Sequence, residues 1–124
     1  MNALVSIITP SYNSAKFIAE TIYSVQNQTY QNWEMIIVDD GSSDETESVV
    51  ISIIQNDNRI QFHKLNQNSG PAVARNTGIE KASGDYMTFI DADDIWFPTF
   101  IENNIKTIQE TGIPFVFSSY KRYK

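Results

Sequence analysis

The sequence predicts a three-layer α/β fold in which helices cover both faces of a mainly parallel sheet. Apolar runs rich in β-branched residues, such as residues 4–8 and 33–38, alternate with segments whose apolar residues recur at helical spacing. Strands that alternate with helices in this way form parallel sheets. The chain has 124 residues, of which 41% are hydrophobic, which suits a single domain with an ordinary core.

Composition excludes several classes of site. The chain has no cysteine, so it has neither disulfides nor thiolate metal sites, and its single histidine, His63, argues against a histidine-rich zinc site. A net charge of −6 argues against a nucleic-acid groove. No apolar run approaches the roughly 20 residues that span a bilayer. We therefore expect a cytoplasmic protein that contacts a membrane only through regions outside this chain.

The first strand and helix are predicted from residues 4–25. Residues 4–8 form the strand, and Pro10 is expected to end it because proline cannot continue a central ladder. Ser14 is a good N-cap for the helix that follows. The apolar face of that helix consists of Ile18, Ile22 and Val25.

The second strand, residues 33–38, is apolar on both faces at its end. Ser42 and Glu45 have the spacing of a capping box for the next helix. The apolar stripe of that helix consists of Val49, Val50, Ile53 and Ile54. Residues 60–65 alternate more clearly than the first two strands, which predicts an edge strand.

The second half of the sequence predicts two further helices and two strands. Pro71 suits the first position of a helix that runs to about residue 82, and a strand begins at Tyr86. A last helix follows Pro98 and ends at Gly112, with an apolar face formed by Ile101, Ile105 and Ile108. Residues 114–117 are predicted to form a final short strand.

The strand that begins at Tyr86 ends in three carboxylates, Asp91, Asp93 and Asp94. Three acidic groups within four residues repel one another, so each must stay solvated or be neutralised. Carboxylate oxygens are hard ligands, and Asp91 and Asp93 can turn to the same side. We therefore expect a divalent-cation site here. A solvated turn that leads into the last helix is the alternative.

Two other loops follow strands and should lie beside this acidic turn, because ligands of open parallel sheets bind beyond the carboxyl ends of the strands. Residues 9–13 contribute the ring of Tyr12 beside Pro10. Residues 39–44 contribute two adjacent carboxylates and a glycine. A ring, a carboxylate and a cation together predict a nucleoside diphosphate site.

The two adjacent carboxylates are expected to differ in role. Asp39 suits the imide N–H of uracil or thymine, and Asp40 is expected to be the structural member of the pair. Arg75 lies on a stripe of small and apolar residues near a helix N-terminus, where its guanidinium needs a partner. A phosphate is one candidate, and a carboxylate such as Asp39 or Asp91 is the other.

Four stretches of the chain together resemble the N-terminal half of the inverting family 2 glycosyltransferases with the GT-A fold. They are Thr-Pro-Ser-Tyr-Asn (9–13), Ile-Val-Asp-Asp-Gly-Ser-Ser-Asp-Glu-Thr (37–46), Gly-Pro-Ala-Val-Ala-Arg-Asn-Thr-Gly (70–78) and Phe-Ile-Asp-Ala-Asp-Asp (89–94). They occur in the order of the family and span nearly the whole chain. Each stretch alone is weak, but the four together are specific.

The resemblance implies a Rossmann-like GT-A fold and a nucleotide-sugar donor, usually carrying uridine diphosphate or a similar group. It implies nucleotide contacts from Pro10, Tyr12, Asp39, Arg75 and Asp91. It also implies that Asp93, with Asp91, ligates Mn²⁺ or Mg²⁺. The implied reaction is the transfer of a hexose, with inversion, to a hydroxyl of a carbohydrate or lipid-linked acceptor. The implied process is the synthesis of surface polysaccharide or glycoconjugate at the cytoplasmic side of a membrane.

An inverting transfer needs a general base to deprotonate the acceptor hydroxyl. In this family the base is an aspartate or glutamate well beyond the metal motif. We therefore expect residues 1–124 to be the donor-binding half of the enzyme and the base to lie outside them. Asp94 is near the site, but the residues make no convincing case for it as the base.

Three other functions are compatible with parts of the pattern. A non-catalytic nucleotide-binding module stays open. A phosphoacceptor receiver domain would carry acidic residues after its first and third strands, where this chain has Thr9-Pro10 and Leu65-Asn66. A phosphatase with an aspartate nucleophile would carry its Asp-x-Asp motif at the first strand, whereas here the motif follows the fourth.

Overall fold

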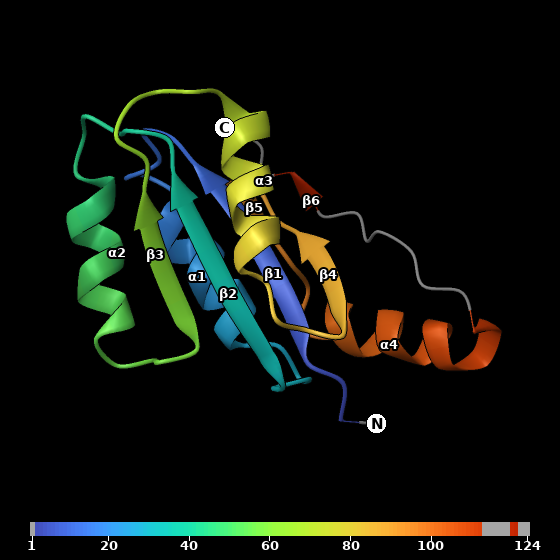
Figure 1. The fold of residues 1–124 in the computed structure, drawn as a ribbon. Helices are drawn as coiled ribbons and strands as arrows, with labels where there is room; N and C mark the ends of the chain where they lie inside the picture. The colour runs from blue at the N-terminus through green and yellow to red at the C-terminus, as the bar shows by residue number, and fades with distance from the viewer. Residues whose placement is uncertain (1, 113–119, 122–124) are drawn as a thin grey trace.

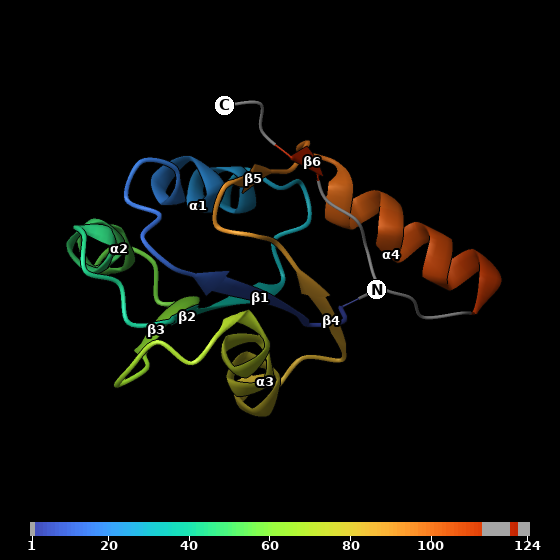
Figure 2. The same ribbon diagram turned by 90° about the horizontal axis from the view of Figure 1, so that it is seen from above.

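A computed structural model of the chain describes residues 2–112 and 120–121 and shows three layers (Figures 1 and 2). The middle layer is a parallel sheet with the strand order β3-β2-β1-β4. Its strands are β1 (Val5–Ser11), β2 (Trp33–Asp39), β3 (Ile60–Lys64) and β4 (Tyr86–Phe89). The parallel sheet and the edge position of β3 are confirmed.

Helices cover both faces of this sheet, as predicted. One face carries α1 (Ile18–Gln26) and α2 (Thr46–Ile54), and the opposite face carries α3 (Pro71–Lys81) (Figure 2). A fourth helix, α4 (Phe100–Thr111), lies beyond β4 (Figure 2). It ends at Gly112, whose left-handed backbone (φ 71°) makes the expected C-cap.

A short antiparallel pair, β5 (Asp94–Ile95) with β6 (Tyr120–Lys121), adds a second sheet that the sequence pattern did not predict. Two residues per strand are too few to produce a periodic signal. The predicted strand at residues 114–117 lies outside the described residues. No helix in the described part of the chain combines the length and apolar character needed to cross a membrane.

Alternation along β2 divides the core between the two faces of the sheet. Met35 and Ile37 belong to the larger apolar cluster on the α1 and α2 side, whereas Ile36 and Val38 pack with Ala74 on the α3 side. The prediction that this strand is apolar on both faces is therefore confirmed. The larger cluster also includes Ile101 and Ile105 of α4.

The prediction that Pro10 ends the first strand is wrong. β1 continues to Ser11 and pairs Pro10 with Val38 of β2. On its other side β1 pairs with β4 only as far as Ile8, whose carbonyl accepts the N–H of Ile90. Alternate residues of a strand address opposite neighbours, so Pro10 faces the side where β4 has already ended. Its missing N–H costs no ladder hydrogen bond there.

Both predicted helix caps are also wrong. Helix α1 begins at Ile18, not directly after Ser14, and the hydroxyl of Ser14 donates to the carbonyl of Tyr12. Helix α2 begins at Thr46, with no side-chain hydrogen bond from its N-cap residue. The hydroxyl of Ser42 instead donates to Asp39. Both serines therefore bind groups in the loops after β1 and β2 and do not cap a helix.

Candidate functional site

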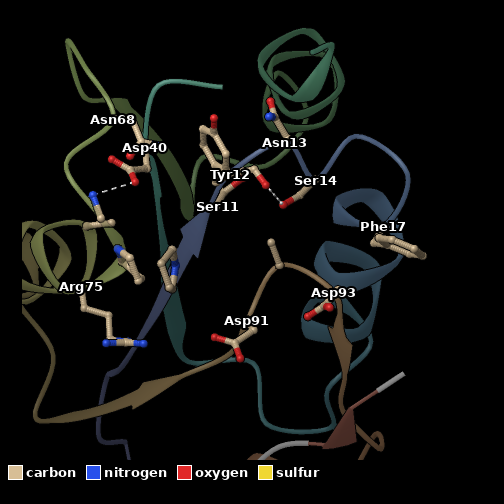
Figure 3. A pocket seen from close by; sticks show the side chains of 15 residues that line it. Ser11, Tyr12, Asn13, Ser14, Phe17, Asp40, Asn68, Arg75, Asp91 and Asp93 are labelled. Atoms are coloured by element: carbon tan, nitrogen blue, oxygen red, sulfur yellow. Dashed lines mark hydrogen bonds between the residues drawn. The ribbon is translucent and has the colours of Figure 1, made fainter. Parts of the chain in front are cut away.

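A cavity of about 530 Å³ opens at the carboxyl ends of β1, β2 and β4 (Figure 3). Ligand pockets of proteins typically measure about 300–1,000 Å³. The loops after β1 and β4, Asp40 after β2, and the start of α3 converge on it. Its lining residues are Pro10, Ser11, Tyr12, Asn13, Ser14, Phe17, Asp40, Asn68, Gly70, Pro71, Ala74, Arg75, Asp91, Ala92 and Asp93.

The acidic turn after β4 brings three carboxylates together. One oxygen from each of Asp91, Asp93 and Asp94 lies within 4.8 Å of the other two. The backbone N–H of Asp94 donates to the carbonyl of Asp91 at 3.0 Å, which closes the turn. Asp91 and Asp93 are half-buried and line the cavity, whereas Asp94 is buried and does not.

The donor set of this turn fits a divalent cation. All three groups are carboxylates, which Mg²⁺ and Mn²⁺ accept, and their mutual repulsion falls when a cation lies between them. Since only Asp91 and Asp93 reach the cavity, these two are the residues that could bind a cation shared with a ligand.

Arg75 lies on α3, opposite the acidic turn. Its side chain is exposed and extends toward Asp91 across the lower part of the cavity (Figure 3). No hydrogen bond or ion pair within residues 2–112 involves its guanidinium, so the alternative of a structural ion pair with Asp39 or Asp91 is not found. Its charge is therefore available to an anionic ligand near the N-terminal turn of α3.

The adjacent acids after β2 have different partners. Asp39 is fully buried, and its carboxylate accepts hydrogen bonds from the N–H of Ser42 at 2.8 Å and from its hydroxyl at 2.6 Å. Asp39 is not among the lining residues. Asp40 does line the cavity, and it accepts the N–H groups of Ser69 and Gly70 at 2.7 and 2.9 Å. Asp40 therefore holds the loop that leads into α3.

Asn13 connects the loops after β1 and β2, a role that the sequence pattern did not reveal. Its backbone is left-handed (φ 48°), a conformation that asparagine tolerates better than most residues. Its N–H donates to the Ser42 hydroxyl at 2.8 Å, and its side-chain oxygen accepts the N–H of Ser43 at 2.9 Å. The only available signal was the general preference of asparagine for turns.

A carboxylate at the edge of these loops strengthens the connection. Burial raises the pKa of Asp44, but hydrogen bonds from the hydroxyl and N–H of Thr46 and from the N–H of Ala15 outweigh it and hold the pKa below its usual value. The ionised Asp44 thus links the start of α2 to the loop after β1. The result is a stable base for Tyr12, whose ring is 50% exposed beside the half-buried Pro10.

Comparison with known proteins identifies the family. A profile described as Glycosyl transferase family 2 matches residues 6–124. This chain belongs to glycosyl transferase family 2. The Escherichia coli protein WfgD, named a UDP-Glc:alpha-D-GlcNAc-diphosphoundecaprenol beta-1,3-glucosyltransferase, is 42% identical over 118 residues, which are 95% of this chain and 46% of WfgD. The chain thus spans about half the length of such curated relatives.

Two solved structures show the same fold. Staphylococcus aureus TarS in complex with UDP-GlcNAc matches with a TM-score of 0.82 and 32% identity, over 87% of this chain and 32% of that one. The mannosyltransferase PcManGT of Pyrobaculum calidifontis, in complex with GDP-Man and Mn²⁺, matches with a TM-score of 0.84 and 26% identity, over 91% of this chain and 34% of that one. The expected GT-A fold is therefore confirmed.

Proposed function

We propose that this chain is the donor-binding half of an inverting glycosyltransferase that uses a nucleoside diphosphate sugar and a divalent cation. One observation carries the proposal. A single cavity joins an exposed aromatic ring, an arginine without a protein partner among the described residues and a cluster of carboxylates. The ring suits the base, the arginine suits the diphosphate, and the carboxylates suit the cation. The likeness to proteins solved with UDP-GlcNAc and with GDP-Man and Mn²⁺ supports it.

In the proposed complex, Tyr12 and Pro10 contact the nucleoside and Arg75 contacts the diphosphate. Asp39 accepts a hydrogen bond from the base after the side chains of its loop rearrange, because its carboxylate is buried against Ser42 in this structure. Asp93 and Asp91 hold the cation, with Asp91 also near the ribose. The bound cation, Mn²⁺ or Mg²⁺, offsets the charge that develops on the departing diphosphate.

The acceptor hydroxyl attacks the anomeric carbon from the side opposite the diphosphate, which inverts the configuration. A carboxylate outside residues 1–124 takes the proton of that hydroxyl as general base. In this proposal, residues 1–124 bind and orient the donor, and the acceptor is activated by a residue outside them. WfgD is named for an acceptor linked to diphosphoundecaprenol, and by analogy we propose a lipid-linked acceptor. We also propose surface polysaccharide synthesis at the cytoplasmic face of a membrane as the process.

Isothermal titration of this chain with UDP and with GDP, each in Mn²⁺ and in EDTA, tests the proposal. We expect binding of UDP that is at least about tenfold tighter in Mn²⁺ than in EDTA, and weaker binding of GDP, because two carboxylates share the cation with the diphosphate. Absence of binding by both nucleotides in both buffers would refute the proposed function. Tighter binding of GDP would keep the function but change the base.

A further inference from the structure

Helix α1 and the residues just after it carry a row of buried polar side chains. Thr21 and Ser24 of the helix are 0% and 8% exposed, and Gln28, two residues past its end, is 2% exposed. A buried helix face is normally apolar, and each buried polar side chain needs a hydrogen-bond partner. All three side chains find partners in one segment, the backbone of residues 92–101.

This segment contains the acidic turn and the chain that follows it, and most of it has no regular structure. Figure 2 shows it running from β4 over to β5, which lies beside α1. Buried backbone groups outside helices and sheets must find other partners. The polar side chains of α1 and Gln28 supply those partners, and Thr21 of the helix supplies the ones in the acidic turn.

Thr21 contacts the acidic turn itself. Its hydroxyl oxygen lies 2.9 Å from the carbonyl oxygen of Ala92 and 2.8 Å from that of Asp94. The hydroxyl also lies 3.3 Å from the carbonyl oxygen of Phe17, so its one proton faces three acceptors, of which the two in the acidic turn are nearer. The two carbonyls flank Asp93, the residue proposed to ligate the cation.

The other two side chains contact the chain further along. The Ser24 hydroxyl accepts the N–H of Trp96 at 3.3 Å. The Gln28 amide donates to the carbonyl of Phe97 at 2.6 Å and accepts the N–H of Ile101 at 3.0 Å. These contacts hold the path into α4 and do not touch the carboxylates.

From this geometry we propose that Thr21 is a positioning residue for the divalent-cation site. It holds the carbonyls on both sides of Asp93, so that the carboxylates of Asp91 and Asp93 stay together in the cavity before a cation binds. Carboxylates within 4.8 Å of one another repel, and the Thr21 contacts oppose the movement of the turn that this repulsion favours. Thr21 contacts neither cation nor nucleotide; it acts through the backbone of the turn. This inference rests on the proposed function.

The test compares Thr21→Val with Gln28→Leu. Each variant removes side-chain hydrogen bonds to residues 92–101 at nearly constant side-chain size, and we expect each to lower the melting temperature by about 5 °C. Only Thr21→Val should change cation binding. We expect about tenfold weaker binding of Mn²⁺ alone, followed by electron paramagnetic resonance of free Mn²⁺, and an equal loss of UDP affinity in Mn²⁺. UDP affinity in EDTA should stay unchanged.

Thr21→Ser keeps the hydroxyl and should restore Mn²⁺ affinity to within about twofold of the unaltered chain. If Thr21→Val does not fold, Thr21→Cys, which replaces the hydroxyl by a weak donor, is held to the same criteria. Equal loss of Mn²⁺ affinity in the valine and Gln28→Leu variants, or no loss in either, would overturn the inference. Absence of Mn²⁺-dependent UDP binding in the unaltered chain would overturn the proposed function itself and this inference with it.

Discussion

Carboxylates gather at both ends of the parallel sheet, and their surroundings differ. At the amino end, Glu34 of β2 accepts hydrogen bonds from the hydroxyl of Ser6 and from the N–H and hydroxyl of Ser83. At the carboxyl end, Asp91, Asp93 and Asp94 bring their oxygens within 4.8 Å of one another. Serine donors surround the carboxylate at the amino end, whereas the carboxyl end places three carboxylates together beside the cavity.

The amino end also contains a complete ion pair. Arg59 contacts Asp57 at 2.9 Å and lies over the ring of Trp33, 3.8 Å from its centre. The Arg59 hydrogen bond is the main reason why the pKa of Asp57 is lowered. The carboxylates at the amino end bind donors that belong to the fold, whereas two of those at the carboxyl end line a cavity. A cluster of carboxylates in a cavity indicates a ligand.

The largest expected effect is at the carboxyl end. Asp93→Ala should abolish the Mn²⁺-dependent part of UDP binding, a loss of about 100-fold or more, because it removes a proposed ligand of the cation. The variant should stay folded, because Asp93 is half-buried at the cavity and belongs to neither apolar cluster. Calorimetry with UDP in Mn²⁺ and in EDTA, with a thermal melt of the apo chain, measures both.

Glu47→Ala is the matched control for this variant. It removes an exposed carboxylate that pairs with Lys64 at 3.0 Å and does not line the cavity, and it should change neither binding nor stability by more than about 1 kcal/mol. An Asp93→Ala variant that still binds UDP more tightly in Mn²⁺ than in EDTA, as the unaltered chain is expected to, would contradict the assignment of Asp93.

The opposite pattern is expected at the amino end. Glu34→Ala leaves the Ser6 and Ser83 groups without their acceptor and should lower the free energy of unfolding by about 2–3 kcal/mol. UDP affinity of the folded protein should not change. Urea unfolding and calorimetry provide the two measurements. Loss of nucleotide affinity with no loss of stability would contradict the assignment of Glu34 to the stability of the fold.

Asp39→Asn tests a residue that combines features of both ends of the sheet. It is buried like Glu34 and accepts two hydrogen bonds from Ser42, yet it lies in a loop of the site. If it also accepts from the base, the variant should weaken UDP binding by about tenfold and leave the affinity for Mn²⁺ alone unchanged. A proportional loss of both affinities would instead assign Asp39 to the structure of the loop.

The smallest effect is a pH dependence at the amino end. Burial raises the pKa of Glu34, but the hydrogen bonds from Ser6 and Ser83 outweigh it, so the folded-state pKa lies below the unfolded value. The ionised group therefore stabilises the fold above the unfolded pKa, and this contribution disappears as the pH falls through the lowered folded-state pKa. The difference in unfolding free energy between the unaltered chain and Glu34→Gln should be constant near pH 7 and shrink below about pH 4. A difference that grows as the pH falls would contradict a lowered pKa of Glu34 in the folded state.

Much of the fold was predictable because it depends on local pattern. Apolar runs and helical spacing predicted the four parallel strands and four helices, and Pro71 and Gly112 correctly marked a helix start and a helix end. The caps at Ser14 and Ser42 were wrong because their side chains bind groups in the loops of the site instead. Whether a serine caps a helix or joins two loops depends on which partner lies within reach.

The sequence by itself determined the chemistry available at the carboxyl end of the sheet, namely the ring of Tyr12, the charge of Arg75 and the carboxylates of the acidic turn. Only the tertiary structure decided which side chains support these groups. Asp39 is buried against Ser42, Asp40 binds the loop before α3, and Thr21 contacts the backbone of the acidic turn. Those contacts join residues about 30 to 70 positions apart or depend on one rotamer, and no local periodicity encodes such distances.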